Sequence, residues 1–259
     1  MMDTSTYTCD CGKSHGGMAS APPPGWEWRD GKLLCDDCTA SGNQSPAPQL
    51  DLSEPASAAT VPHTCPTAIR LLSGGYLDLA DPDCSIIQPM DIAAGLRQGR
   101  FSGQTRQFYT IAQHCLLVLR LVSPVARQIG GERGLALRRC ALMHDAPEAF
   151  IHDITRPLKI ILPDYRRVEA VLDKRLCARF GVEWTGGRHE IVKRADMQAL
   201  AIEQRDLKGI EDPWPVLANV DREALTAIRI TRAWHPDEAE EHFLRAFDEL
   251  FSQPERMAA

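Results

Sequence analysis

A short stretch of the sequence gathers ionisable residues directly after an apolar segment. Residues 140–159 read CALMHDAPEAFIHDITRPLK, in which His144 and Asp145 are adjacent and Glu148 and Asp153 follow. Charged groups are costly to bury unpaired, so these side chains are either solvated at a helix end or held together by a cation. Imidazole and carboxylate groups are typical ligands of first-row divalent ions. The stretch therefore raises metal-dependent chemistry as a hypothesis.

Two further residues of ligand type lie in other apolar segments. His114 borders the apolar stripe of YTIAQHCLLV, and Asp196 lies within VKRADMQALA. Two imidazoles and two carboxylates, with the His144-Asp145 pair included, suit one Zn, Mn, Co, Mg or Fe ion with positions left for water and substrate. A single His or Asp in a helix is more often solvated or structural, so spacing alone leaves both interpretations open.

The elements that must position these residues are expected to be helices. Apolar periodicity, proline and glycine predict helices over 89–98, 105–122, 135–145, 163–180, 189–207, 221–233 and 236–251. In the second of these, Ile111, Cys115, Val118 and Val122 form one apolar stripe. Pro147 should interrupt the helix that carries His144. Residues 75–81 are the strand candidate, as part of a small hairpin, and the predicted fold class is all-α.

Composition divides the chain of 259 residues into three parts. Residues 1–38 hold four cysteines and few aliphatic residues, which are too few for a hydrophobic core. Residues 39–63 are rich in Ser, Ala and Pro and are predicted to be a flexible linker. Residues 64–252 contain the helical patterns and have enough apolar residues for one sizeable core.

The N-terminal cysteines have the spacing of a metal site. Cys9 and Cys11 form a Cys-x-Cys pair, and Cys35 and Cys38 form a Cys-x-x-Cys pair. Four thiolates on two short loops favour a structural zinc ion in a module that resembles a zinc ribbon. The tight first pair leaves His15 as an alternative ligand, and incidental cysteines in an unfolded tail are the other interpretation. Its role, whether nucleic-acid contact, protein contact or tethering, stays open.

Net charge and apolar patterning limit the partners. A formal charge of −6 argues against broad nucleic-acid binding, so an anionic ligand would need local Arg and Lys residues. The first residues lack the apolar core of a secretory signal, and the apolar stretch 116–122 is too short to cross a bilayer. We therefore expect a cytoplasmic protein without membrane contact, whose thiols stay reduced.

Five phrases of the sequence resemble a known family. They are GRFSG (99–103), YTIAQHC (109–115), ALMHDAPEAFIHDITRPLK (141–159), LPDYRRVE (162–169) and VKRADMQALAIEQRDL (192–207). In this order they are similar to the HD-domain phosphohydrolases, whose pattern is H…HD…D, and above all to YfbR-type 5′-deoxynucleotidases and phage dATP triphosphohydrolases. The resemblance covers roughly 70–250. It implies a helical HD domain that hydrolyses deoxynucleotides, to release phosphate or triphosphate, and that forms a homo-oligomer.

The resemblance also implies roles for individual residues. It makes His114, His144, Asp145 and Asp196 the ligands of one divalent ion. Glu148 matches a catalytic acid that orients the attacking water or protonates the leaving oxygen. Asp153 matches a second acidic residue beside the water and the substrate.

Three residues match the substrate-binding positions of the family. Arg100 and Phe101 match an Arg-aromatic pair that contacts phosphate and sugar, and Lys159 matches a lysine near the phosphate. Phe101 stands where the bacterial deoxynucleotidases carry tryptophan, and His152 stands where they carry a small residue. These two departures leave the size of the substrate open.

Two functions of different classes follow from the sequence. The first is a metal-dependent phosphohydrolase of deoxynucleotides. The alternative is a zinc-ribbon module that binds nucleic acid or protein and is joined to a catalytically inert HD scaffold. Glu148 and Asp153 favour the enzyme, because a scaffold has no reason to keep acids beside metal ligands.

Overall fold

The computed structural model describes residues 64–209 and 214–252, together with the backbone of four strands nearer the N-terminus. The chain divides into two compact units, Met1–Ala56 and Ser57–Ala259, and the division falls within the predicted linker.

The N-terminal unit contains two antiparallel hairpins that the sequence did not predict. Strand β1 (Ser5–Thr8) pairs with β2 (Ser14–Gly17), and β3 (Glu27–Arg29) pairs with β4 (Lys32–Leu34). The predicted zinc ligands Cys9, Cys11, Cys35 and Cys38 lie outside the described residues, as does the predicted linker 39–63.

The C-terminal unit is mostly helical, as predicted. Its α-helices are α2 (Pro89–Gly95), α3 (Ile111–Ile129), α4 (Gly131–Met143), α5 (Glu148–Ile151), α6 (Arg156–Ile161), α7 (Pro163–Phe180), α8 (Arg188–Glu203) and α9 (Pro236–Phe251). Short 3₁₀ turns are η1 (Pro82–Cys84), η2 (Arg100–Gly103), η4 (Pro215–Leu217) and η5 (Glu223–Leu225), and η3 (Gln204–Lys208) is a π-helical turn. Strands β5 (Ala68–Arg70) and β6 (Tyr76–Asp78) form an antiparallel hairpin, which confirms the strand expected within 75–81.

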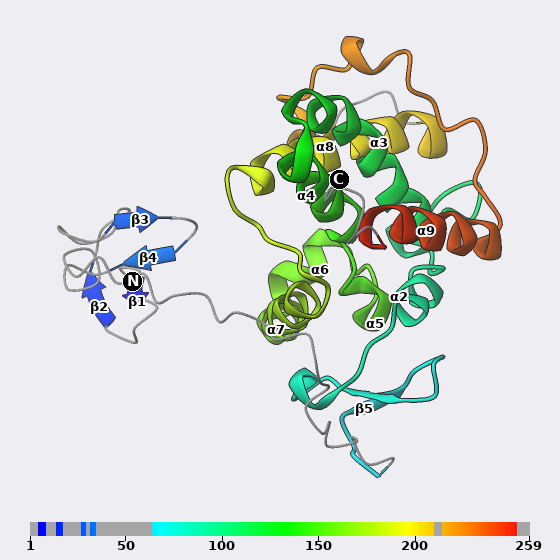
Figure 1. Cartoon of the computed structure of the whole chain (residues 1–259). Coiled ribbons are helices and arrows are strands. Elements are labelled where there is room, and N and C mark those ends of the chain that lie inside the picture. The colour runs from blue at the N-terminus through cyan, green and yellow to red at the C-terminus, as the bar shows by residue number, and fades with distance from the viewer. Residues whose placement is uncertain are drawn as a thin grey trace. The chain divides into compact units, whose positions relative to one another are not determined.

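Helix α3 packs against α4, α8 and α9 and lies at the core of this unit (Figure 1). The predicted stripe of Ile111, Cys115, Val118 and Val122 is buried, which confirms the apolar face. Gly134 lets α4 approach α3, because a Cβ atom there would lie 2.2 Å from the carbonyl oxygen of Ala126 on α3. None of the helices in the described ranges combines the length and apolar character that a membrane crossing needs.

The predicted bounds of the 105–122 helix are wrong at both ends. Helix α3 begins at Ile111 because the Thr110 side chain caps it by accepting the Gln113 N–H at 3.1 Å. It continues past Pro124 to Ile129, although an interior proline removes a backbone hydrogen bond. Val122 and Ala126, on either side of that proline, are buried, so core packing outweighs the cost.

The predicted helix over 221–233 is wrong, since the segment holds only the 3₁₀ turn η5. Side chains of η3 form hydrogen bonds with the backbone of this segment, in place of the backbone hydrogen bonds of a helix. Arg205 donates to the carbonyl oxygens of Leu225 and Ile228 at 3.2 and 2.6 Å, and Asp206 accepts the Ile230 N–H at 2.8 Å. The spacing of apolar residues in the sequence does not reveal such side-chain partners.

The chain breaks after α4, as expected from Pro147, and then forms the short helices α5 and α6, which were not predicted. Helix α5 packs against α2 at Gly95. A Cβ atom at Gly95 would lie 2.2 Å from the carbonyl oxygen of Ala149, and Gln98 Nε2 donates to that oxygen at 3.1 Å. This contact fixes Glu148, the first residue of α5.

Candidate metal centre

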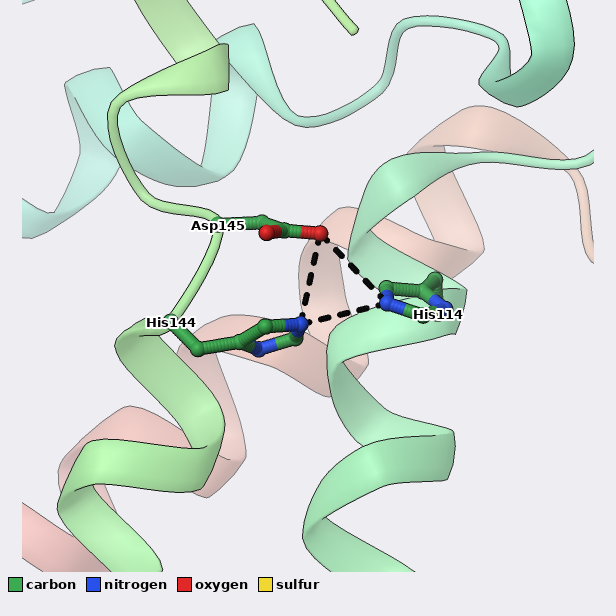
Figure 2. Close-up of side chains that lie close together, drawn as sticks. All are labelled: His114, His144 and Asp145. Carbon is green, nitrogen blue, oxygen red and sulfur yellow. Dashed lines mark hydrogen bonds and ion pairs between the residues drawn. The ribbon is translucent and has the colours of Figure 1, made fainter. Parts of the chain in front are cut away.

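The two predicted histidine ligands and Asp145 come together at the junction of α3 and α4 (Figure 2). His114 lies in the first turns of α3, His144 directly follows α4, and Asp145 lies in the next turn. The two Nε2 atoms are 3.2 Å apart, and Asp145 Oδ2 lies 3.4 Å from that of His114 and 3.3 Å from that of His144. The ligand atoms of the three residues all lie within 4.8 Å of one another, which is close enough to share one ion.

Asp196 of α8, the fourth predicted ligand, reaches the same place. Its Oδ1 lies 3.4 Å from His114 Nε2, and its Oδ2 accepts from Lys193 Nζ at 2.9 Å. Three long helices, α3, α4 and α8, therefore direct ligand atoms to one point.

The far side of each imidazole contacts a hydrogen-bond acceptor. His114 Nδ1 lies 2.6 Å from the Glu203 carboxylate, and His144 Nδ1 lies 3.0 Å from the Ala141 carbonyl oxygen. An acceptor at Nδ1 keeps a proton there, so in its neutral form each ring would turn an Nε2 lone pair toward the other. Two facing lone pairs 3.2 Å apart require a positive charge nearby. The donor set thus fits a divalent metal ion.

The pKa values of these groups also indicate that the site requires a positive charge near the two Nε2 atoms. Burial and the Arg100 charge lower the pKa of His114, but Glu203 and Asp145 contribute to raising it well above its ordinary value. Burial also lowers the pKa of His144, yet Asp145 raises it to about 10. Burial raises the pKa of Asp145, and the two imidazoles more than offset this and hold it well below its usual range. The site therefore favours positive charge at its centre.

Glu203 is a site residue that the sequence reasoning missed. Its side chain is fully buried and contacts the fully buried His114. The available signal is its place seven residues after Asp196, two turns along the same face of α8, as a carboxylate within the apolar run ALAIE. The π-helical turn η3 begins directly after it, and such turns are frequent at functional sites.

Arg100, which was predicted to bind phosphate, lies among the carboxylates of the site. Its guanidinium is 3.0 Å from Asp145, 3.3 Å from Glu203 and 3.9 Å from Asp196. Burial lowers the pKa of Arg100, but nearby carboxylates, Glu203 and Asp145 above all, raise it well above its ordinary value, so the side chain stays charged. The Arg100 charge partly neutralises the negative charge of these three carboxylates, which lie close together.

The ligand set opens onto a cavity of about 740 Å³. The cavity wall includes the ligands Asp145 and Asp196 and all the predicted catalytic and substrate-binding residues, namely Arg100, Phe101, Glu148, Asp153 and Lys159. Lys193, Lys208 and Arg156 line it as well. Its volume is in the range of small-molecule sites, and its basic residues suit an anion in a chain of net negative charge.

Glu148 is buried at the border between the ligands and this cavity. Burial, with Asp145 and Asp153, raises the pKa of Glu148 to about 8. Lys159 Nζ lies 3.1 Å from Glu148 and 2.7 Å from Glu169, so its charge is shared between two carboxylates. A carboxyl group in this setting can hold or accept a proton near neutral pH.

A second cavity, of about 550 Å³, reaches the ligands as well. Glu169, Asp173, Arg166 and His189 line it, together with the residues Asp145, Glu148, Lys193 and Asp196 that the first cavity also contacts. The shared residues form a wall that both cavities reach.

Two relatives place the chain among known sequences. It is 38% identical over 157 residues to the uncharacterized protein YfdR of Escherichia coli K12, a match that spans 59% of this chain and 79% of YfdR. It is 34% identical over 149 residues to the uncharacterized protein RCAP_rcc00048 of Rhodobacter capsulatus, which spans 55% of this chain and 74% of the relative. No family model matches the chain. The chain belongs to the family of YfdR and RCAP_rcc00048.

Proposed function

We propose that this protein is a metal-dependent phosphohydrolase of the HD-domain type that acts on deoxynucleotides. The observation that carries the proposal is the approach of His114, His144, Asp145 and Asp196 to one point on the wall of a cavity lined with basic side chains. The resemblance of the motifs to HD-domain phosphohydrolases supplies the substrate class. No single residue carries the proposal alone, because lone His and Asp residues are common in helices.

The four ligands would hold one divalent ion, and Glu203 and the Ala141 carbonyl oxygen would keep both imidazoles oriented toward it. When bound, the ion would polarise a phosphoryl oxygen and make water a stronger nucleophile. The acidic partners and the facing Nε2 atoms suit a first-row ion such as Mn, Co, Fe or Zn, or Mg.

The other residues of the cavity would bind the substrate and move the proton. Glu148 borders the cavity beside Asp145, where its carboxyl group would orient the attacking water or protonate the leaving oxygen. Lys159 holds that carboxyl group in place. Arg100, Lys159 and Lys193 line the cavity and would offset phosphate charge as it develops during attack on phosphorus.

The test is to incubate the protein with each dNMP and dNTP in the presence of Mn, Co, Mg or Zn and to separate the products by chromatography. Release of inorganic phosphate from monophosphates indicates a nucleotidase, and release of triphosphate indicates a triphosphohydrolase. Absence of any product with every metal overturns the proposal and favours an inert scaffold.

The same assay on His114→Ala should show no turnover and no bound Mn or Co. His235→Ala is the matched control, because this histidine is exposed on the N-terminal side of α9. Retention of Mn or Co by His114→Ala at the wild-type level would rule out the ligand assignment.

A further inference from the structure

The cavity beside the metal ligands has an aromatic and apolar part that takes no part in the metal binding and proton transfer proposed above. Its apolar wall residues are Phe101, Ile154, Pro157, Met197, Leu200, Trp214 and Val216. None of these side chains transfers a proton at neutral pH or suits a hard divalent ion. A cavity with both charged and apolar walls fits a ligand that has an anionic group and a flat apolar body.

Phe101 and Trp214 form the aromatic part of this wall. Their ring centroids are 6.1 Å apart and the ring planes are tilted by 57°, so the rings are not stacked face to face. Both side chains are half-buried. Lys208 Nζ lies 5.1 Å from the Phe101 centroid and 5.9 Å from the Trp214 centroid. This part of the cavity therefore presents two aromatic rings and the Lys208 cation to a bound ligand.

The backbone at Phe101 is held in an unfavourable conformation. Phe101 and Ser102 have φ values of 56° and 52°, in the left-handed region that L-residues rarely adopt. The Phe101 N–H donates to Asp153 Oδ2 at 3.1 Å, and the Arg100 N–H donates to the Tyr109 carbonyl oxygen at 2.8 Å. Such strain is retained where the surrounding structure requires it, often at ligand sites.

The same turn joins the charged and aromatic parts of the cavity. The Arg100 guanidinium lies 5.5 Å from the Phe101 ring centroid and 3.0 Å from Asp145. A ligand whose anionic group reaches the metal ligands therefore has the Phe101 ring beside it.

We propose, on the basis of the function proposed above, that the aromatic part of the cavity binds the base of the nucleotide and that Trp214 is the ring on which the base stacks. A nucleobase is flat and stacks on aromatic side chains whatever its sequence identity. Lys208, beside both rings, would lie near hydrogen-bond acceptors at the edge of the base, which are ring nitrogens in adenine. Trp214 lies outside the motifs that resemble the HD-domain enzymes, so that resemblance assigns it no role.

The test compares a nucleotide that the protein hydrolyses with its base-free 2-deoxyribose counterpart. Trp214→Ala should raise KM for the nucleotide about 5- to 150-fold, the range expected for loss of one base-aromatic stack. It should leave KM for the base-free compound unchanged, and Trp214→Phe should restore most of the loss. A variant that is merely unfolded would lose both substrates alike. If Trp214→Ala keeps the wild-type circular dichroism spectrum, an equal effect on both substrates, or on neither, overturns the assignment.

Equilibrium dialysis with radiolabelled dAMP separates this inference from the proposed function. If the wild-type protein hydrolyses no nucleotide but binds dAMP, and Trp214→Ala weakens binding while Trp234→Phe does not, the base site stands and the hydrolase proposal fails. Trp234 is the control because it packs against His242 of α9 and does not line the cavity. Absence of dAMP binding, or binding that Trp214→Ala leaves intact, overturns the base site.

Discussion

At the scale of single residues, the candidate centre depends on groups that stand behind the ligands. His114 and His144 face each other through Nε2 because acceptors occupy their Nδ1 positions. A carboxylate or carbonyl oxygen in that position fixes the tautomer and the ring plane, and it makes the free nitrogen a better donor to a cation. Glu203 therefore affects any bound ion without touching it.

Glu203→Gln should lower the affinity for Mn or Co about 10- to 100-fold, the usual effect of altering such a partner. The variant keeps the volume of the side chain but removes the negative charge next to the His114 Nδ1–H. Isothermal titration of the metal-stripped protein measures the change. Glu249→Gln on the exposed side of α9 is the control. Equal affinity in Glu203→Gln and wild type would contradict the role given to Glu203.

The residue types of this site were predictable, and their partners were not. His114, the His144-Asp145 pair and Asp196 could be selected as ligands because their types suit a metal and similar motifs occur in known enzymes. Glu203 was missed because a carboxylate in a helix usually faces solvent, and only the packing of α8 against α3 shows that it is buried. The ion pairs of Arg100 with three carboxylates likewise depend on the fold.

At the scale of elements, close helix contacts set the position of the acid. Helix α5 has four residues and carries Glu148 at its start. Its packing depends on the missing side chain of Gly95 in α2, where the Ala149 carbonyl oxygen fills the space of a Cβ atom. The position of Glu148 is thus coupled to the packing of α2.

Gly95→Ala should destabilise the protein by about 1–3 kcal/mol, because the added methyl group overpacks this contact. It should also reduce kcat, since α5 and Glu148 must shift away from α2. Urea unfolding and steady-state kinetics measure the two effects. Gly75→Ala is the matched control, because its nearest neighbour would lie at an ordinary 3.8 Å. A fully stable and active Gly95→Ala variant would show that this contact does not fix α5.

The sequence predicted some element bounds well and others poorly for physical reasons. Helices α7 and α9 both begin at a proline, and α7 ends before Gly181, so local signals determine them. The expected helix over 221–233 failed because Arg205 and Asp206, distant in sequence, bind its backbone. The start expected at residue 105 failed because the Thr110 cap and the bridge between Gly99 and Thr110 delay α3.

At the scale of the whole molecule, the chain consists of two compact units, and the described residues that form the candidate centre lie in the second. In the part of the chain that the structure describes, the groups that pair with the two imidazoles come from residues between Arg100 and Glu203.

A variant lacking residues 1–60 should therefore retain Mn or Co binding, because the described site residues lie in the second unit. Its turnover should stay within about twofold of that of the full chain, a difference of roughly 0.4 kcal/mol in the activation free energy. If the four N-terminal cysteines hold zinc, the variant should lose one zinc ion per chain, as measured by mass spectrometry of the metal content. Loss of Mn or Co binding on deletion would show that the first unit contributes to the centre.

The left-handed turn at Phe101 and Ser102 limits which side chains this chain can carry at these two positions. Residues branched at Cβ, such as valine or isoleucine, fit such φ values poorly, whereas asparagine and glycine adopt them readily. Few substitutions at these two positions would therefore leave the turn unstrained. At the proposed base site, substrate preference is more easily changed through Trp214, whose φ of −60° imposes no such restriction.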